Sequence, residues 1–74
     1  MTDQPDFELG RYRHYKGFEY EAIDLARHSE TCEWMVVYRQ QYGERGLWVR
    51  PLAMFTEDVV IDGISQARFA KIEN

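Results

Sequence analysis

Two strings that combine arginine and histidine are the first residues of this chain that could do chemistry. Residues 13–16 read Arg-His-Tyr-Lys, and residues 27–30 read Arg-His-Ser-Glu. The arginine side chain is a planar fork that binds phosphate or carboxylate, and histidine titrates close to neutral pH. These strings therefore indicate an anion-binding site if the fold brings them together.

The same polar strings also allow a structural interpretation. In that alternative, Ser29 or Thr31 bonds local backbone in a closed loop, while Glu30 and Glu33 pair with nearby arginines. A straight strand from Phe18 would place the second string roughly 33 Å away at its far end. Only a bend near Ala22, together with closure of the strands into a barrel, would then join the two strings in one site.

Aromatic residues alternate with arginine in the middle of the chain. Tyr38-Arg39 and Tyr42 precede the string Trp48-Val-Arg-Pro51. Such interleaving is typical of platforms that stack nucleobases or clamp proline-rich peptides. If Leu47 and Val49 face inward, Trp48 and Arg50 share the exposed face. The alternative is that Trp48 only covers one end of the core.

Metal binding and catalysis are weakly supported by the residue types. His28 and Cys32 stand four apart and His14 could join them, but no second ligand pair has the spacing that zinc favours. Ser29 lacks a glycine pattern of the nucleophile-elbow kind, and the glycine turn at 43–46 lacks the Lys-Ser/Thr of a phosphate loop. We therefore expect no metal, no cofactor and no catalytic residue.

The composition indicates one small globular domain. The chain has 74 residues, and 15% of them are aromatic, which is too many for a disordered segment. A net charge of −4 argues against a binder of long duplex nucleic acid, because phosphate neutralisation dominates that affinity. No apolar run reaches the ~20 residues of a membrane span, and no secretory signal pattern is visible. With one unpaired cysteine, these features predict a cytoplasmic protein without membrane contact.

Short apolar and aromatic segments separated by turn residues predict an all-β fold. Alternation predicts strands over residues 9–14, 18–28, 34–42, 47–50 and 58–61, and a helical turn over 52–55. Because closure removes exposed strand edges, five or six such strands predict a small barrel of antiparallel strands. Residues 1–8 are expected to be a flexible acidic arm before a single domain over residues 9–72.

Two segments keep more than one interpretation. The apolar pattern of residues 18–28 slips by one residue at Ile23, which predicts a β-bulge, although a helix over 20–26 is the alternative. Residues 65–72 fit either a closing strand or a helix capped by Ser65.

Several longer strings stand in a definite order: Gly10-Arg-Tyr-Arg-His-Tyr-Lys-Gly17, Ala26-Arg-His-Ser-Glu-Thr31, Val36-Val-Tyr38, Tyr42-Gly43, Leu47-Trp-Val-Arg-Pro-Leu52 and Met54-Phe55. In these strings the chain resembles a bacterial family known as domain of unknown function 1653. The resemblance spans residues 10–72 and implies a small SH3-like β-barrel with no established activity. The family's tail pattern, Pro-Arg-Phe, is Ala67-Arg68-Phe69 here. The motif positions that match are Tyr12, Arg13, His14, Tyr15, Gly17, Arg27, His28, Ser29, Glu30, Tyr38, Trp48, Arg50 and Pro51.

Together these observations predict a non-enzymatic binding module whose Arg/His/aromatic face takes a small anionic or nucleotide-like ligand. The expected partner is a nucleotide or a short single-stranded nucleic acid. The alternative is a protein-interaction or regulatory module that docks a partner chain or self-associates through Trp48, Tyr42 and Phe55. The predicted ligand-binding residues are Arg13, His14, Arg27, His28, Ser29, Glu30, Tyr38, Trp48 and Arg50.

Overall fold

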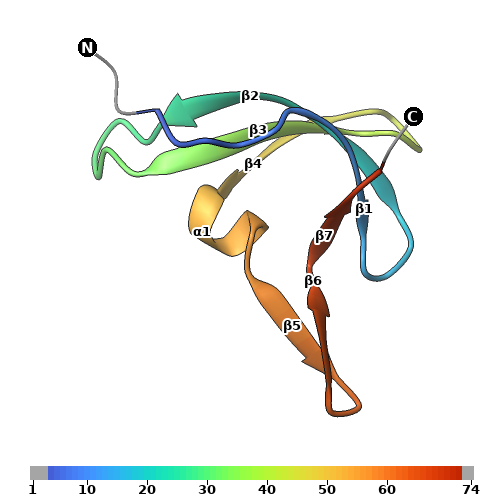
Figure 1. The fold of residues 1–74 in the computed structure, drawn as a ribbon. Helices are drawn as coiled ribbons and strands as arrows, with labels where there is room; N and C mark the ends of the chain where they lie inside the picture. Colours follow the sequence, from blue (N-terminus) through green and yellow to red (C-terminus); the bar gives the residue numbers. More distant parts are fainter. Residues whose placement is uncertain (1–3, 73–74) are drawn as a thin grey trace.

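The chain is mostly β, with seven antiparallel strands and one helical turn (Figure 1). The computed structural model describes residues 4–72. The predicted strands and the helical turn over 52–55 are all present, but the predicted number of five or six strands was too low, because the C-terminal segment forms two strands rather than one. The elements are β1 (Gly10–His14), β2 (Glu19–Arg27), β3 (Trp34–Gln40), β4 (Leu47–Pro51), α1 (Leu52–Phe55), β5 (Asp58–Ile61), β6 (Ile64–Ala67) and β7 (Phe69–Lys71).

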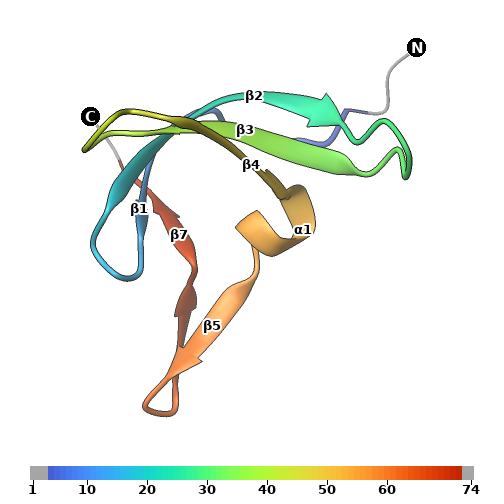
Figure 2. The ribbon, with the colours of Figure 1, turned by 180° about the vertical axis from the view of Figure 1, so that it is seen from behind.

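The strands form an open sheet rather than the predicted closed barrel. Five strands pair in the order β4-β3-β2-β1-β7, and β5 pairs with β6 as a separate hairpin that extends away from the sheet (Figures 1 and 2). Within residues 4–72, β4 and β7 both remain edge strands. The barrel does not close because β5 and β6 pair with each other, leaving β7, with three residues, to pair with β1.

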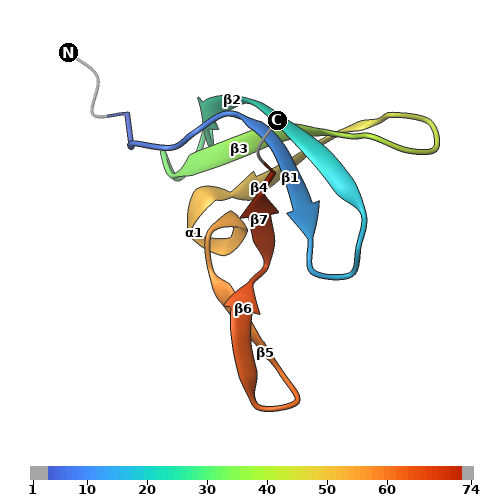
Figure 3. The same ribbon diagram turned by 45° about the vertical axis from the view of Figure 1, so that its right-hand side comes forward.

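The predicted β-bulge in β2 is confirmed. Its pairing with β3 shifts register between Ala22 and Asp24, where the apolar pattern slips by one residue. The alternative helix over residues 20–26 is wrong, because this segment is extended. A bulge bends a strand and increases its twist, and β2 curves along its length (Figure 3).

Aromatic side chains make most of the small core beneath this curved sheet. The buried residues are Tyr12, Ala22, Val36, Tyr38, Phe55 and Phe69. The helical turn that follows Pro51 brings Phe55 under the sheet, where its ring stacks on Phe69 with 4.0 Å between centroids. Such pairs stabilise a core beyond the area they bury. The core therefore depends on rings from both ends of the sequence.

Part of the predicted N-terminal arm packs on this core. The Phe7 ring stacks on Tyr12 at 5.7 Å and meets Phe55 edge-on at 5.6 Å. Residues 1–3 of the arm lie outside the described residues. Phe7 thus supplies an apolar contact that the acidic composition of the arm did not suggest.

The C-terminal segment is extended, as one of its two interpretations predicted. Between β5 and β6, Asp62 and Gly63 both have positive φ, 52° and 78°, which is the pattern of a type I′ hairpin turn. Arg68 separates β6 from β7; its guanidinium contacts the Glu57 carboxylate at 3.2 Å. Among the described residues no helix is long and apolar enough to cross a membrane, since α1 has four residues.

Candidate ligand-binding site

A small hollow on the α1 side of the sheet collects three of the predicted ligand-binding residues. We call it the Arg50 hollow. Tyr20 of β2 stands opposite Gln40 of β3, and Tyr38 stands opposite Trp48 of β4. Directly opposed residues point to the same face of a sheet, so these side chains gather on one face. The hollow has a volume of about 210 Å³ and is lined by Tyr20, Tyr38, Gln40, Tyr42, Trp48 and Arg50.

Hydrogen bonds hold the walls of the Arg50 hollow in place. The Trp48 indole N–H donates to Gln40 Oε1 at 2.5 Å, and Gln40 Nε2 donates to the Tyr42 carbonyl at 3.2 Å. The hydroxyls of Tyr20 and Tyr42 lie 2.7 Å apart. Burial, together with this hydrogen bond, raises the pKa of Tyr20 to about 12. The hollow is therefore organised without a ligand, which lowers the entropic cost of binding one.

Arg50 is the cation of this hollow. Its Nε donates to the Tyr38 hydroxyl at 3.4 Å, and its guanidinium lies 5.7 Å from the centroid of the Phe69 ring. The ion pairs within residues 4–72 join Arg11 and Arg13 to Glu19, Arg68 to Glu57, and Lys71 to Glu8. None of them includes Arg50. A half-buried guanidinium without a carboxylate partner is suited to receive an anion.

His14 borders the same aromatic cluster. Its ring meets Phe69 edge-on at 4.9 Å and Tyr20 at 6.5 Å. Burial lowers the pKa of His14 below 6.5, and the positive charges of Arg50, Arg68 and Lys16 lower it further. The imidazole is therefore mostly neutral at pH 7, and it can add a hydrogen-bonding group beside Arg50 rather than a second charge.

The second arginine–histidine string lies elsewhere. It begins with Arg27 at the end of β2 and continues into the loop of residues 28–33 that joins β2 to β3, which we call the His28 loop. The Arg27 guanidinium stacks on Trp34 at 4.2 Å and donates to the Cys32 carbonyl at 2.9 Å. His28 Nδ1 accepts the backbone N–H groups of Glu30 and Thr31, at 3.1 and 3.3 Å. The loop thus uses its own polar groups to close itself.

The bulge in β2 does not join the two strings. Arg27 pairs with Trp34 at one end of the β2–β3 ladder, whereas Tyr20 pairs with Gln40 at the other end. The predicted residues Arg27, His28, Ser29 and Glu30 are consequently separated from the Arg50 hollow. The structural interpretation of this string holds in part: Thr31 Oγ1 accepts the Glu33 backbone N–H at 3.2 Å, but the ion pairs within residues 4–72 include neither Glu30 nor Glu33.

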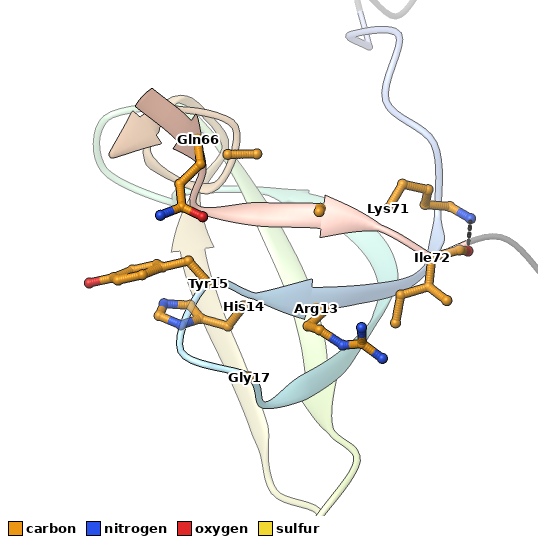
Figure 4. Close-up of a pocket in the computed structure, with 9 residues that line it drawn as sticks. Arg13, His14, Tyr15, Gly17, Gln66, Lys71 and Ile72 are labelled. Carbon is orange, nitrogen blue, oxygen red and sulfur yellow. Dashed lines mark hydrogen bonds between the residues drawn. The ribbon is translucent and has the colours of Figure 1, made fainter. Parts of the chain in front are cut away.

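Arg13 lines a second and larger hollow along β1 and β7, shown in Figure 4. Its guanidinium bonds Glu19 at 2.9 Å and holds the pKa of that carboxyl below its usual value. Lys71 lies 3.7 Å from Glu8 and donates to the Ile72 carbonyl at 3.2 Å. Arg13 and Lys71 therefore each already have a carboxylate partner. The hollow measures about 390 Å³ and is lined by Arg13, His14, Tyr15, Gly17, Gln66, Ala67, Ala70, Lys71 and Ile72.

Three lining residues of the Arg50 hollow, Tyr20, Gln40 and Tyr42, were absent from the predicted set of ligand-binding residues. Gln40 follows Tyr38 by two positions on β3, so strand alternation places both on one face. Tyr20 lies on the same face across the ladder. The alternation was visible in the sequence, whereas the pairing register that adds Tyr20 was not. Within residues 4–72, no group of three or more His, Cys, Asp or Glu side chains is arranged to hold a metal ion.

Comparison with known proteins shows the family of this chain. Residues 10–71 match the family described as protein of unknown function (DUF1653), so the chain belongs to that family. A crystal structure of a DUF1653 protein from Bordetella bronchiseptica is similar to it, with 43% sequence identity and a TM-score of 0.83. The match covers 90% of this chain and 88% of the Bordetella chain. No match was found among the curated proteins.

Proposed function

We propose that this protein is a non-enzymatic binding module for a small, planar, anionic ligand of the nucleotide type. The observation that carries the proposal is Arg50, a guanidinium without an acidic partner in the described chain, beside four aromatic side chains. Stacking of a base on Trp48 or Tyr42 with the phosphate on Arg50 would use both features.

The size of the Arg50 hollow favours one ring over a larger ligand. Its volume of about 210 Å³ is below the roughly 300–1,000 Å³ of pockets that enclose a drug-sized molecule. Trp48 stands at an exposed position beside it. A single base would therefore occupy the hollow while the rest of a nucleotide or a short single strand stays in solvent.

The histidines favour binding without turnover. His14 Nδ1 accepts the Lys16 backbone N–H, and His28 Nδ1 accepts two backbone N–H groups of its own loop. Within residues 4–72, no hydrogen bond joins either histidine to a hydroxyl or thiol. Nucleophilic catalysis needs such a base within hydrogen-bond reach of its nucleophile.

Isothermal titration calorimetry with AMP, adenosine and inorganic phosphate tests the proposal. We expect AMP to bind more tightly than adenosine or phosphate alone. Loss of a charged hydrogen bond costs about 1.5–3 kcal/mol, so Arg50→Gln should weaken AMP binding by ~10–100-fold. Arg13→Gln is the matched control, since that arginine faces the other hollow, and it should bind like the native protein. Absence of AMP binding, or an equal loss in both variants, would contradict the proposal.

Protein interaction is a second candidate function, and one feature of β4 favours it. Phe55, which was expected on such a surface, is only 1% exposed and cannot meet a partner. Leu47, Trp48 and Val49 are all exposed on β4 instead. A partner chain would therefore meet the free edge of this strand.

A further inference from the structure

The backbone of β4 has polar groups that no described part of the chain satisfies. Gln40 N–H donates to the Gly46 carbonyl at 3.1 Å, so alternate residues from Gly46 onward, which include Trp48, direct their backbone groups toward β3. Leu47 and Val49 therefore direct their N–H and C=O groups away from the sheet. Figure 2 shows β4 on the near side of the sheet with no further strand beyond it.

This edge lacks the usual protection against pairing with another chain. Natural edge strands are blunted by lysine, by bulges, by proline or by shortness. On the opposite edge, β7 has only three residues and ends in Lys71. On β4, the exposed side chains are instead apolar, with Leu47 56%, Trp48 54% and Val49 60% exposed. Pro51 blunts only the last position of the strand.

We propose that β4 is a self-complementary edge, and that two copies of this chain pair through it, antiparallel, about a twofold axis at Trp48. This deepens the second candidate function and does not depend on the ligand proposal. In this register, Leu47 stands opposite Val49 of the second copy, and Trp48 opposite Trp48. Every outward N–H and C=O of Leu47 and Val49 then finds a partner. Every exposed apolar side chain of β4 also meets an apolar one.

Neighbouring registers of the same pairing leave a backbone group of β4 unpaired or place like charges opposite each other. A twofold axis at Val49 would place Leu47 opposite Pro51, which has no N–H, and the Leu47 carbonyl would stay unpaired. An axis at Arg50 would place two guanidinium groups directly opposite each other, and like charges in that position destabilise a sheet. With the axis at Trp48, Arg50 stands opposite Gly46, so of these three registers only this one avoids both costs.

The expected association is weak and reversible. β4 has five residues, so the pairing buries less than the ~1,200 Å² of a standard protein interface. A monomer–dimer equilibrium should therefore be seen at the concentrations used for NMR, and the monomer should dominate on dilution.

Amide hydrogen exchange of the ligand-free protein, measured over a concentration series alongside sedimentation velocity, tests the register directly. Exchange at an edge amide requires the monomer, so the exchange rates of Leu47 and Val49 should fall in proportion to the monomer fraction. The Gly63 amide, in the β5–β6 turn, is the internal control and should keep its rate. A monomer at every concentration, or a dimer whose Leu47 and Val49 amides exchange unchanged, would overturn the proposal.

The substitution Val49→Pro separates edge pairing from other modes of association. It removes an outward N–H that β3 does not use, so the β3–β4 ladder is kept. We expect this variant to stay monomeric, while Val49→Ala, which retains the N–H, still dimerises. Dimerisation of Val49→Pro at the native level would overturn the proposal. If Val49→Pro fails to fold, the exchange rates of the native protein remain the deciding measurement.

Discussion

The His28 loop and the Arg50 hollow contain the same kinds of residue and use them in opposite ways. In the loop, Arg27 covers Trp34 and bonds the Cys32 carbonyl, and the His28 ring accepts two backbone N–H groups. In the hollow, hydrogen bonds fix the aromatic walls, but Arg50 has no carboxylate partner within residues 4–72. Neither Arg27 nor Arg50 has a carboxylate partner within residues 4–72, but Arg27 donates to a backbone carbonyl of its loop at 2.9 Å, whereas the bond from Arg50 to the Tyr38 hydroxyl is longer, at 3.4 Å.

This difference indicates how to separate structural from functional arginines in a small domain. An arginine that donates a short hydrogen bond to a backbone carbonyl of its own loop, as Arg27 does, stabilises that loop. An arginine among aromatic rings without a counter-charge carries an unsatisfied desolvation cost, which an anionic ligand would offset. Arg13, paired with Glu19 at 2.9 Å on the outer face, belongs with the structural group.

The largest expected effect comes from Phe69, where the hollow and the core meet. The ring stacks on Phe55 at 4.0 Å and supports the Arg50 guanidinium. Phe69→Ala should lower the free energy of unfolding by about 3–5 kcal/mol, which is the usual cost of truncating a core phenylalanine. Chemical denaturation measures this, with Phe69→Leu as a milder variant that stays folded for binding assays. A loss of less than about 1 kcal/mol would show that the hollow is not supported by the core.

Trp48→Ala should separate binding from stability. The indole is 54% exposed, so its removal should hardly change the melting temperature. If a base stacks on it, binding of AMP should weaken by about 1–3 kcal/mol. Trp34→Phe is the control, because Trp34 packs on Arg27 at the far end of the sheet, and its AMP affinity should equal that of the native protein. Equal affinities of Trp48→Ala and native protein would exclude stacking at this position.

His28→Ala should lower the stability of the fold without weakening AMP binding, the opposite of the effect expected for Trp48→Ala. Two backbone N–H groups lose their acceptor, so the free energy of unfolding should fall by about 1 kcal/mol. Thermal unfolding measures this loss, and AMP affinity should stay unchanged because the loop is remote from the hollow. A variant of native stability that binds AMP more weakly would assign His28 to the ligand site instead.

The smallest expected effect is a pH dependence from His14. Its folded pKa is lowered, so between that value and 6.5 the unfolded chain binds more protons than the folded one. Stability should therefore be complete above pH 6.5 and decrease as the pH falls through 6.5 toward the folded pKa. An NMR titration of the imidazole should give a midpoint below 6.5. Arg50→Gln should raise this midpoint, since one neighbouring charge is removed; a midpoint that does not move would contradict the placement of His14.

Sequence patterns predicted the local elements because these depend on neighbouring residues. Alternation identified the strands, and the one-residue slip at Ile23 identified the bulge of β2. The closed barrel was wrong because closure depends on long-range pairing. The Asp62-Gly63 turn, flanked by Ile61 and Ile64, favours a local hairpin, and β5 and β6 then pair with each other instead of extending the sheet.

The sequence predicted the part of the candidate site whose residues are placed by strand alternation. Tyr38 stands directly opposite Trp48, and Arg50 follows Trp48 by two positions, so the three side chains lie on one face of the sheet. The function of the Arg27-His28 string was not predictable in the same way. Its hydrogen bonds need the specific shape of the His28 loop, in which Cys32 takes a positive φ of 65°.

The most direct test of the contrast between the Arg50 hollow and the His28 loop is a titration of the 15N-labelled protein with AMP, followed by two-dimensional NMR. One spectrum contains the Trp48 indole N–H, the Arg50 side chain and the amides of the His28 loop. We predict saturable shifts at Trp48, Tyr42 and Arg50, with the amides of residues 28–33 unchanged. Shifts centred on the His28 loop, or no shift at Trp48 at millimolar AMP, would contradict the account.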